Sequence, residues 1–155
     1  MSIAPTLARY LDQTVTYELL FHNPTMSSSR TAQASHVSGD RFAKAVLLRR
    51  DGTFLLAVLP ASRQLDLSEL RAALGADIDL ARESEVDAWF ADCEHGAVPP
   101  VGECYGLDVM VDESIDRAPE VYFEAGDHTT LVHMTQAQFA LLTASARHRR
   151  FSLRG

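Results

Sequence analysis

Two apolar runs joined by an Asp-Gly turn constrain the fold of this chain most strongly. Residues Ala43–Leu48 and Phe54–Leu59 are both apolar, and Asp51-Gly52 lies between them. An Asp-Gly pair favours the tight turn of an antiparallel hairpin, because the central residues of that turn adopt positive φ angles. We therefore predict a β-hairpin at the centre of the fold.

Further helices and strands are predicted from local patterns on both sides of this hairpin. Helices are expected where apolar residues recur at helical spacing after a capping residue or a proline, and strands where short runs of β-forming residues end at turn residues. The predicted helices are Pro5–Gln13, Arg30–Val37, a segment capped by Asp66 or Ser68 that runs to Leu74, Ser84–Phe90 and Gln136–Ala146; the further strands are Tyr17–His22, Ile78–Leu80, Leu107–Val111, Val121–Phe123 and Leu131–Met134. Residues 96–102 hold two prolines and two glycines and are expected to be irregular.

These elements predict a mixed α/β fold with a largely antiparallel sheet and helices packed around it. The 155 residues fit one domain, 1–155, since no repeat or linker divides the chain. No apolar run reaches the ~20 residues that span a bilayer, and Met1–Arg9 lacks the features of a secretory signal. Two cysteines are too few for a disulfide framework. We expect a cytoplasmic protein that does not associate with membranes.

The charged residues are distributed unevenly along the chain. A net charge of −7 argues against broad, nonspecific binding to nucleic acid. Residues 147–155 nevertheless form a basic tail, which either contacts a phosphate backbone or is a solvated, frayed terminus. Asp108, Asp112, Glu113 and Asp116 are interpreted as a solvated acidic edge.

Lys44 is the only lysine among the 14 basic residues. Lysine carries a compact ammonium on a thin stem, whereas arginine carries a wide planar fork that does not lose its proton. A general preference for arginine would explain the other basic residues but not this exception. Lys44 is therefore a candidate functional residue, and the simpler alternative is a surface lysine at the start of a strand.

Other catalytic patterns are not favoured. Cys93, His95 and Cys104 lack the paired Cys-x-x-Cys spacing of structural zinc sites. Neither a Gly-x-Ser-x-Gly motif nor a phosphate-binding glycine loop is present. Trp89 is interpreted as a core residue. We expect no metal and no cofactor.

Three segments resemble the trans-acting aminoacyl-tRNA editing domains of the YbaK/ProX family. Phe42–Leu48 with Leu55–Pro60 resembles the lysine-bearing hairpin of that family. Gly96–Gly102 is similar to its glycine–x–x–Pro–Pro loop, and Ala125–His128 resembles its late glycine-centred loop. The order and spacing of the segments match, and the resemblance extends over about Tyr17–Leu142.

The resemblance implies a YbaK-like fold and a hydrolase activity. The implied enzyme is an aminoacyl-tRNA deacylase, which cleaves the carboxylic ester that joins a mischarged small amino acid to tRNA. Such an activity protects the fidelity of translation. Such a site must place the carbonyl, supply donors to the developing oxyanion and exclude the correct amino acid. Lys44 is implied to hold the terminal phosphate or ribose. Gly96 and Gly126 offer backbone N–H donors, and His128 is a candidate for orienting a water. The implied partners are mischarged aminoacyl-tRNA and an aminoacyl-tRNA synthetase.

The remaining candidates are expected to bind the substrate. They are His22, Met26, Ser28, Ala45, Gly96, Pro99, Pro100 and Asp127. Ala45 is small and apolar, which favours a pocket selected by size, and such a pocket discriminates one methylene by ~1–3 kcal/mol. Leu20 departs from the family, because several relatives have a tyrosine at this position. The sequence does not choose which amino acid is removed.

Structural explanations of the same residues stay open. Pro99-Pro100 can be a rigid turn, Gly96 and Gly126 can satisfy backbone angles, and His128 can be an ordinary loop residue. The alternative function is a non-catalytic adaptor of the same fold that binds a small ligand or a synthetase, because a fold does not by itself establish an activity.

Overall fold

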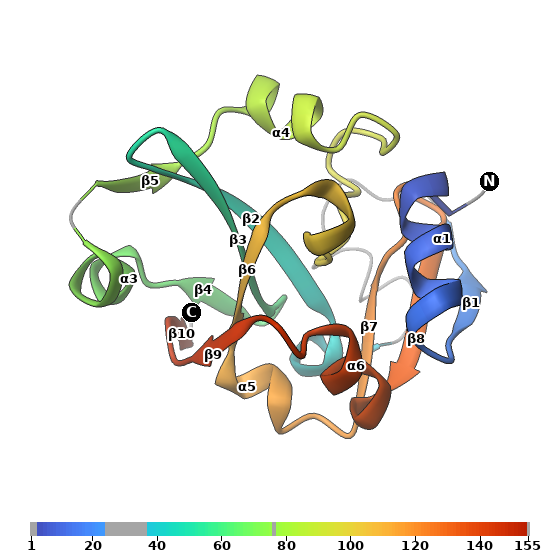
Figure 1. Ribbon diagram of the computed structural model, residues 1–155. Coiled ribbons are helices and arrows are strands. Elements are labelled where there is room, and N and C mark those ends of the chain that lie inside the picture. The colour runs from blue at the N-terminus through green and yellow to red at the C-terminus, as the bar shows by residue number, and fades with distance from the viewer. Residues whose placement is uncertain (1–2, 24–36, 76, 155) are drawn as a thin grey trace.

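The computed structural model describes residues 3–23, 37–75 and 77–154 and confirms a mixed α/β fold (Figure 1). The helices are α1 (Pro5–Thr14), α3 (Leu67–Leu74), α4 (Glu83–Trp89), α5 (Glu113–Asp116) and α6 (Gln136–Leu142), with the short 3-10 helices η1 (Gly39–Arg41) and η2 (Glu103–Tyr105). The strands are β1 (Glu18–Phe21), β2 (Ala43–Arg50), β3 (Thr53–Pro60), β4 (Arg63–Leu65), β5 (Ile78–Leu80), β6 (Asp108–Asp112), β7 (Glu120–Glu124), β8 (Thr130–Thr135), β9 (Arg147–Arg149) and β10 (Ser152–Arg154). The predicted helix Arg30–Val37 lies, except for Val37, outside the described residues. Among the described helices, none combines the length and apolar character that crossing a bilayer requires.

The predicted hairpin forms the centre of the larger sheet, whose strand order is β5-β2-β3-β6-β9. β2 and β3 pair antiparallel over their full length, from Ala43 opposite Pro60 to Arg50 opposite Thr53. Asp51 and Gly52 adopt φ angles of 43° and 82°, as the predicted turn requires. β6 pairs parallel with β3, and β9 pairs parallel with β6, so the sheet is mixed.

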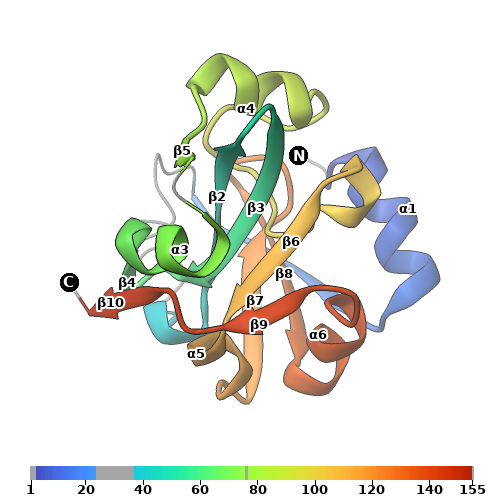
Figure 2. The ribbon, with the colours of Figure 1, turned by 60° about the vertical axis from the view of Figure 1, so that its left-hand side comes forward.

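A second sheet, with strand order β1-β8-β7, is antiparallel throughout. One parallel bridge, Phe42 to Tyr122, joins it to the start of β2. α1 covers this sheet, where Leu7 and Leu11 are fully buried in the largest core cluster (Figures 1 and 2). The start of β2 is thereby held between the two sheets.

The helix ends show how local chemistry sets the elements. Asp66 caps α3 by accepting a hydrogen bond from the backbone N–H of Glu69, and Gly75 ends the helix at a φ of 113°. Thr135 caps α6 as predicted. The predicted end of α6 at Ala146 is wrong, because the helix stops at Leu142 and the chain turns to place β9 beside β6.

The basic tail is not a frayed terminus. Residues Arg147–Arg149 form β9 on β6, and Ser152–Arg154 form β10, which pairs antiparallel with β4. Phe151, between the two strands, is 1% exposed and packs in the core beneath α3. Pairing with strands far away in the sequence orders this segment, and a local pattern does not reveal such pairing.

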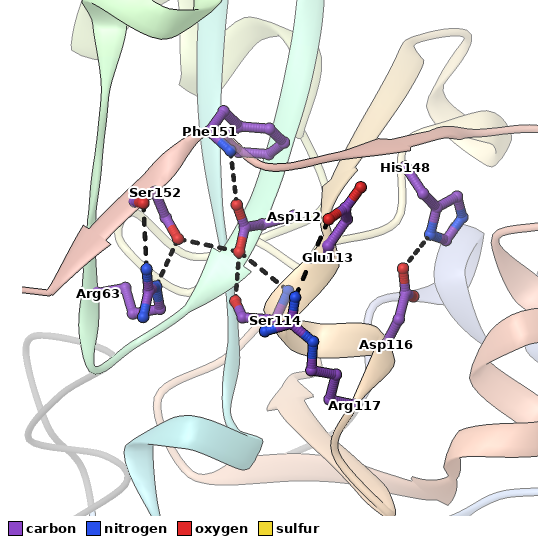
Figure 3. Close-up of polar contacts among 9 residues, drawn as sticks. All are labelled: Arg63, Asp112, Glu113, Ser114, Asp116, Arg117, His148, Phe151 and Ser152. Carbon is purple, nitrogen blue, oxygen red and sulfur yellow. Dashed lines mark hydrogen bonds and ion pairs between the residues drawn. The ribbon is translucent and has the colours of Figure 1, made fainter.

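Asp112 corrects the interpretation of a solvated acidic edge. Its side chain is fully buried. One oxygen accepts the backbone N–H of Phe151 at 2.8 Å, and the other accepts the hydroxyl of Ser152 at 2.9 Å (Figure 3). The second oxygen also accepts the backbone N–H and hydroxyl of Ser114, so Asp112 caps α5 as well. A buried carboxylate with this many donors ties β6, α5 and the C-terminal strands together.

Replacement of Asp112 by asparagine is expected to lower the free energy of unfolding by about 1–3 kcal/mol, because the buried donors lose a charged acceptor. Urea denaturation measures this change. The control is Asp108→Asn, at an exposed position of the same strand, which should change stability by less than about 0.5 kcal/mol. Equal stability of the two variants would contradict the assigned role.

The same carboxylate predicts a dependence on pH. Burial alone would raise the pKa of Asp112, but the N–H of Phe151 and the hydroxyls of Ser114 and Ser152 outweigh it and hold the pKa below its usual range. A depressed folded pKa contributes stability above the unfolded pKa of about 3.9, and this stability is lost as pH falls through the folded pKa. The difference in unfolding free energy between wild type and Asp112→Asn should therefore shrink below about pH 4.

Candidate functional site

The register of the β1-β8-β7 sheet brings the ends of several strands to one place. Leu20 of β1 and Glu124 of β7 both lie opposite Leu131 of β8, so these three side chains share one face. Phe42, at the start of β2, belongs to the same cluster as Leu131 and Leu20. Because side chains alternate along a strand, residues two positions further along lie on that face too.

Two of the predicted site residues occupy those next positions. Lys44 follows Phe42 by two residues, and His22 follows Leu20 by two. The backbone N–H of His22 donates to the carbonyl of Thr129 at 2.8 Å, which extends the β1–β8 ladder to the loop of Gly126 and His128. β2 runs parallel to β7 at their bridge, so Lys44 points toward the same end of the sheet.

Lys44 is partly buried on this face. Removal of water from around its ammonium lowers the pKa of Lys44 below its ordinary value. The same low polarity strengthens the attraction between an ammonium and a nearby anion. The position therefore suits a lysine that meets a phosphate or a developing negative charge.

His128 joins the two glycine loops. Its Nε2 lies 2.6 Å from the carbonyl oxygen of His95, the residue before Gly96. A carbonyl only accepts hydrogen bonds, so Nε2 carries the proton and Nδ1 of the neutral ring carries a lone pair. Nδ1 is buried and has no hydrogen-bond partner among the described residues.

His22 has the opposite tautomer. Its Nδ1 lies 2.7 Å from the carbonyl oxygen of Asn23 and therefore donates, which leaves Nε2 as the acceptor. Nε2 is likewise buried and lacks a hydrogen-bond partner within residues 3–23, 37–75 and 77–154. Adjoining chain segments thus present two imidazole nitrogens with unused lone pairs.

Gly126 has a packing role that its motif did not reveal. Its φ is 107°, and a Cβ added there would lie 2.7 Å from the Cβ of Ala4. The carbonyl of Gly126 accepts the backbone N–H of Glu94 at 2.7 Å, and Ala4 donates to the carbonyl of Ala125 at 2.8 Å. The loop is therefore fixed on one side by the N-terminal segment and on the other by the segment that leads to Gly96.

Asp127 organises the loop that follows Gly126. Its carboxylate accepts the backbone N–H groups of Thr129 at 3.0 Å and Thr130 at 2.7 Å, and also both threonine hydroxyls. Its side chain is 7% exposed. These bonds hold His128 and Thr129 in place, so Asp127 positions the loop that was expected to contact substrate.

The glycine–proline loop is irregular, as predicted. Pro99 and Pro100 are buried, and Gly96 is exposed with a φ of 83°. Gly96 and Ala45 line the same hollow of about 250 Å³, together with Val98 and α4 residue Val86. Strand alternation places Ala45 on the face of β2 opposite Lys44, so this hollow and the Lys44 face lie on two sides of one strand.

Two predicted residues, Met26 and Ser28, lie outside the described residues.

One residue was missed by the sequence argument. Glu124 is only 2% exposed and shares the face of Leu20 and Leu131, directly before the Gly126 loop. Its alternation with the buried apolar residues Val121 and Phe123 marks it as belonging to the opposite face of β7.

The cysteines do not supply a nucleophile near neutral pH. Burial raises the pKa of Cys93 to about 11 and that of Cys104 to about 12, so both thiols stay protonated. Within the part of the chain that the structure describes, no three His, Cys, Asp or Glu side chains gather closely enough to hold a metal ion.

The sequence matches the family model of the aminoacyl-tRNA editing domain over residues 22–142, which include the hairpin and both glycine loops. The chain belongs to the aminoacyl-tRNA editing domain family. This membership confirms the resemblance to the YbaK/ProX group. No curated protein sequence matches this editing domain.

Solved structures share the fold of this editing domain. The hypothetical protein APE2540 is 22% identical, with a TM-score of 0.84 over 96% of this chain and 99% of that chain. A structure provisionally described as a trans-editing enzyme for prolyl-tRNA synthetase is 22% identical, with a TM-score of 0.83 over 98% and 99%. A protein from Marinobacter aquaeolei, provisionally described as a signal transduction protein, is 21% identical with a TM-score of 0.79, and the match covers 98% of this chain but 31% of that one. At these identities the likeness shows the fold alone.

The contact between Gly126 and Ala4 gives a testable consequence. Gly126→Ala should lower the free energy of unfolding by about 2–5 kcal/mol, because backbone strain of ~1–2 kcal/mol adds to overpacking against Ala4 of ~1–3 kcal/mol. Gly75→Ala is the matched control: its φ of 113° is similar, but nothing lies within 4 Å of the added Cβ. Chemical denaturation of both variants separates strain from overpacking, and similar losses in the two would refute the steric role.

Proposed function

We propose that this editing domain hydrolyses the ester that joins a wrongly attached small amino acid to tRNA. Water adds to the carbonyl carbon, the bond to the ribose oxygen breaks, and the free amino acid and the tRNA hydroxyl are released. The observation that carries the proposal is the family match over residues 22–142, which contain Lys44 and both glycine loops. The likeness to a structure provisionally described as a trans-editing enzyme for prolyl-tRNA synthetase makes the tRNA for proline, charged with a wrong amino acid, the first substrate to test.

Lys44 is proposed to hold the terminal phosphate or ribose and so to place the ester. A lysine offers three rotatable donors on a thin stem, whereas arginine presents a wide planar fork. Its partial burial supports this role, because the ammonium meets a phosphate in surroundings of low polarity. Its position on the face of His22 supports it further, since both side chains lie toward the loop of Gly126.

His128 is proposed to orient the attacking water through Nδ1. The ring is fixed by its Nε2–H bond to the carbonyl of His95, so the Nδ1 lone pair has a defined direction. Its burial without a partner among the described residues leaves this acceptor for a water or a substrate group. The backbone N–H groups of Gly96 and Gly126 are the proposed donors to the oxyanion.

Ala45 lines a hollow with Gly96 and Val98 on the face of β2 opposite Lys44, so its methyl group is not proposed to contact the amino acid of an ester held at Lys44. We place the reaction in the cytoplasm, where aminoacyl-tRNA is made and used. A synthetase that releases mischarged tRNA is the proposed partner, because its proximity would raise the effective substrate concentration.

Lys44→Ala should reduce deacylation by about a hundredfold or more, because the ester is no longer placed. The assay follows release of alanine, serine, threonine, cysteine and 2-aminobutyrate from several mischarged tRNAs, including the tRNA for proline. Arg49→Ala, a loss of charge further along the same strand, is the control and should keep wild-type turnover. Deacylation by Lys44→Ala at the wild-type rate would refute the proposed role of this residue. Absence of turnover by wild type on every ester would favour the non-catalytic adaptor.

Two substitutions of His128 separate a chemical from a structural role. His128→Gln retains an N–H that can reach the carbonyl of His95 but replaces the basic Nδ1 with a weakly basic amide oxygen, whereas His128→Ala loses both groups. If Nδ1 orients water, both variants should lower kcat by about tenfold to a hundredfold with KM nearly unchanged. Wild-type turnover by His128→Gln together with loss in His128→Ala would show that the ring only holds the loops together.

A further inference from the structure

Four arginines from separate segments line one hollow at the start of the central hairpin. Arg41 comes from η1, Arg63 from β4, Arg117 from the end of α5 and Arg154 from β10. The hollow encloses about 290 Å³, and Asp40 is the acidic residue among its lining residues. On a chain with a net charge of −7, this concentration of guanidinium groups is local and depends on the fold.

The existing partners of these arginines leave much of the positive charge available. Arg117 and Arg154 are exposed over 74% and 72% of their side chains, and among the described residues they pair with Glu113 and Asp40 at 4.0 and 3.9 Å. Ion pairs of this length at an exposed surface contribute little free energy, so a stronger anion can replace them. Arg41 is the exception, because it pairs with Glu120 at 2.5 Å.

Arg63 is held in place by neutral oxygens. Its Nε donates to the hydroxyl of Ser152 at 2.6 Å, and its Nη2 donates to the carbonyl of Ser152 at 3.1 Å. The hydroxyl of Ser152 in turn donates to buried Asp112 (Figure 3). These two bonds hold the Nε and Nη2 edge of the guanidinium, and no carboxylate among the described residues contacts Arg63 directly. The cation is therefore preorganised to bind an anion.

The hollow adjoins the start of β2, the strand that carries Lys44, and lies toward the opposite end of β7 from the Gly126 loop, because Pro119 is among its lining residues. Arg41 lies two residues before β2, and Pro60, another lining residue, pairs with Ala43, the neighbour of Lys44. A polymer with its end at Lys44 that runs along the start of β2 toward η1 would therefore bring its following anionic groups to the arginines. Guanidinium groups suit this contact because their forks match the oxygens of a phosphate.

We infer that this arginine-lined hollow binds backbone phosphate of the tRNA substrate, on the nucleotides that precede the terminal one carrying the ester. The inference rests on the proposed function for the identity of the RNA. The arginines do not take part in hydrolysis. They supply the phosphate contacts that an otherwise acidic protein needs to engage RNA.

The test measures binding of deacylated tRNA, so that no hydrolysis is involved. The double variant Arg117→Gln/Arg154→Gln should bind about tenfold more weakly, and the slope of log K against log salt should decrease by about 1–2. Both side chains are highly exposed, so an unchanged thermal midpoint is expected and is measured alongside. Arg9→Gln is the control: it is an exposed arginine on α1, on the far side of the molecule from β10, and should leave both quantities unchanged (Figures 1 and 2).

Unchanged affinity and salt slope in the double variant would overturn the inference, and so would an equal loss in Arg9→Gln. Loss of binding to an acidic synthetase surface with tRNA binding intact would overturn it in favour of a protein partner. The proposed function fails separately. If wild type hydrolyses mischarged tRNA and the arginine substitutions leave tRNA binding unchanged, only the inference is refuted. If tRNA binding depends on the arginines but no ester is hydrolysed, only the proposed activity is refuted.

Discussion

The pairing of β2 with β3 is the interaction on which the rest of the molecule depends. β3 is buried from Leu55 to Pro60, because β2 and β6 cover its two edges and core clusters cover both of its faces. The turn at Asp51-Gly52 fixes the register of the pair, and the register decides which face receives Lys44. A slip by one residue would turn that lysine to the opposite face and put Ala45 in its place.

The elements that could be predicted are those whose cause is local. The hairpin, the Asp66 cap of α3 and the Thr135 cap of α6 each follow from a few neighbouring residues, and each is present. Lys44 was a candidate as the only lysine, and the family resemblance supported it and supplied the glycine loops. The convergence of Lys44, His22 and the Gly126 loop required the strand order of two sheets and the bridge from Phe42 to Tyr122.

What could not be predicted depends on partners distant in the sequence. In the sequence, Asp112 cannot be distinguished from the neighbouring acidic residues. Its burial is favourable only because Phe151 and Ser152 donate hydrogen bonds to it. The C-terminal arginines likewise suggested a loose basic tail, although β9 and β10 find partners on β6 and β4. Arg63 and Arg117 drew no attention in the sequence, because nothing local indicates that they meet Arg41 and Arg154 in one hollow.

The donors to Asp112 also affect the order of events during synthesis. The hydroxyl of Ser152 belongs to a residue translated 40 positions after Asp112. At about 5–20 residues per second, a ribosome adds this residue roughly 2–8 s later. Until then the carboxylate keeps its hydration shell, so the end of β6 cannot become buried. A nascent chain therefore completes this corner of the protein only when the segment around Phe151 has left the ribosome, and a message cut short before it would yield a product with a hydrated charge at the base of its central sheet.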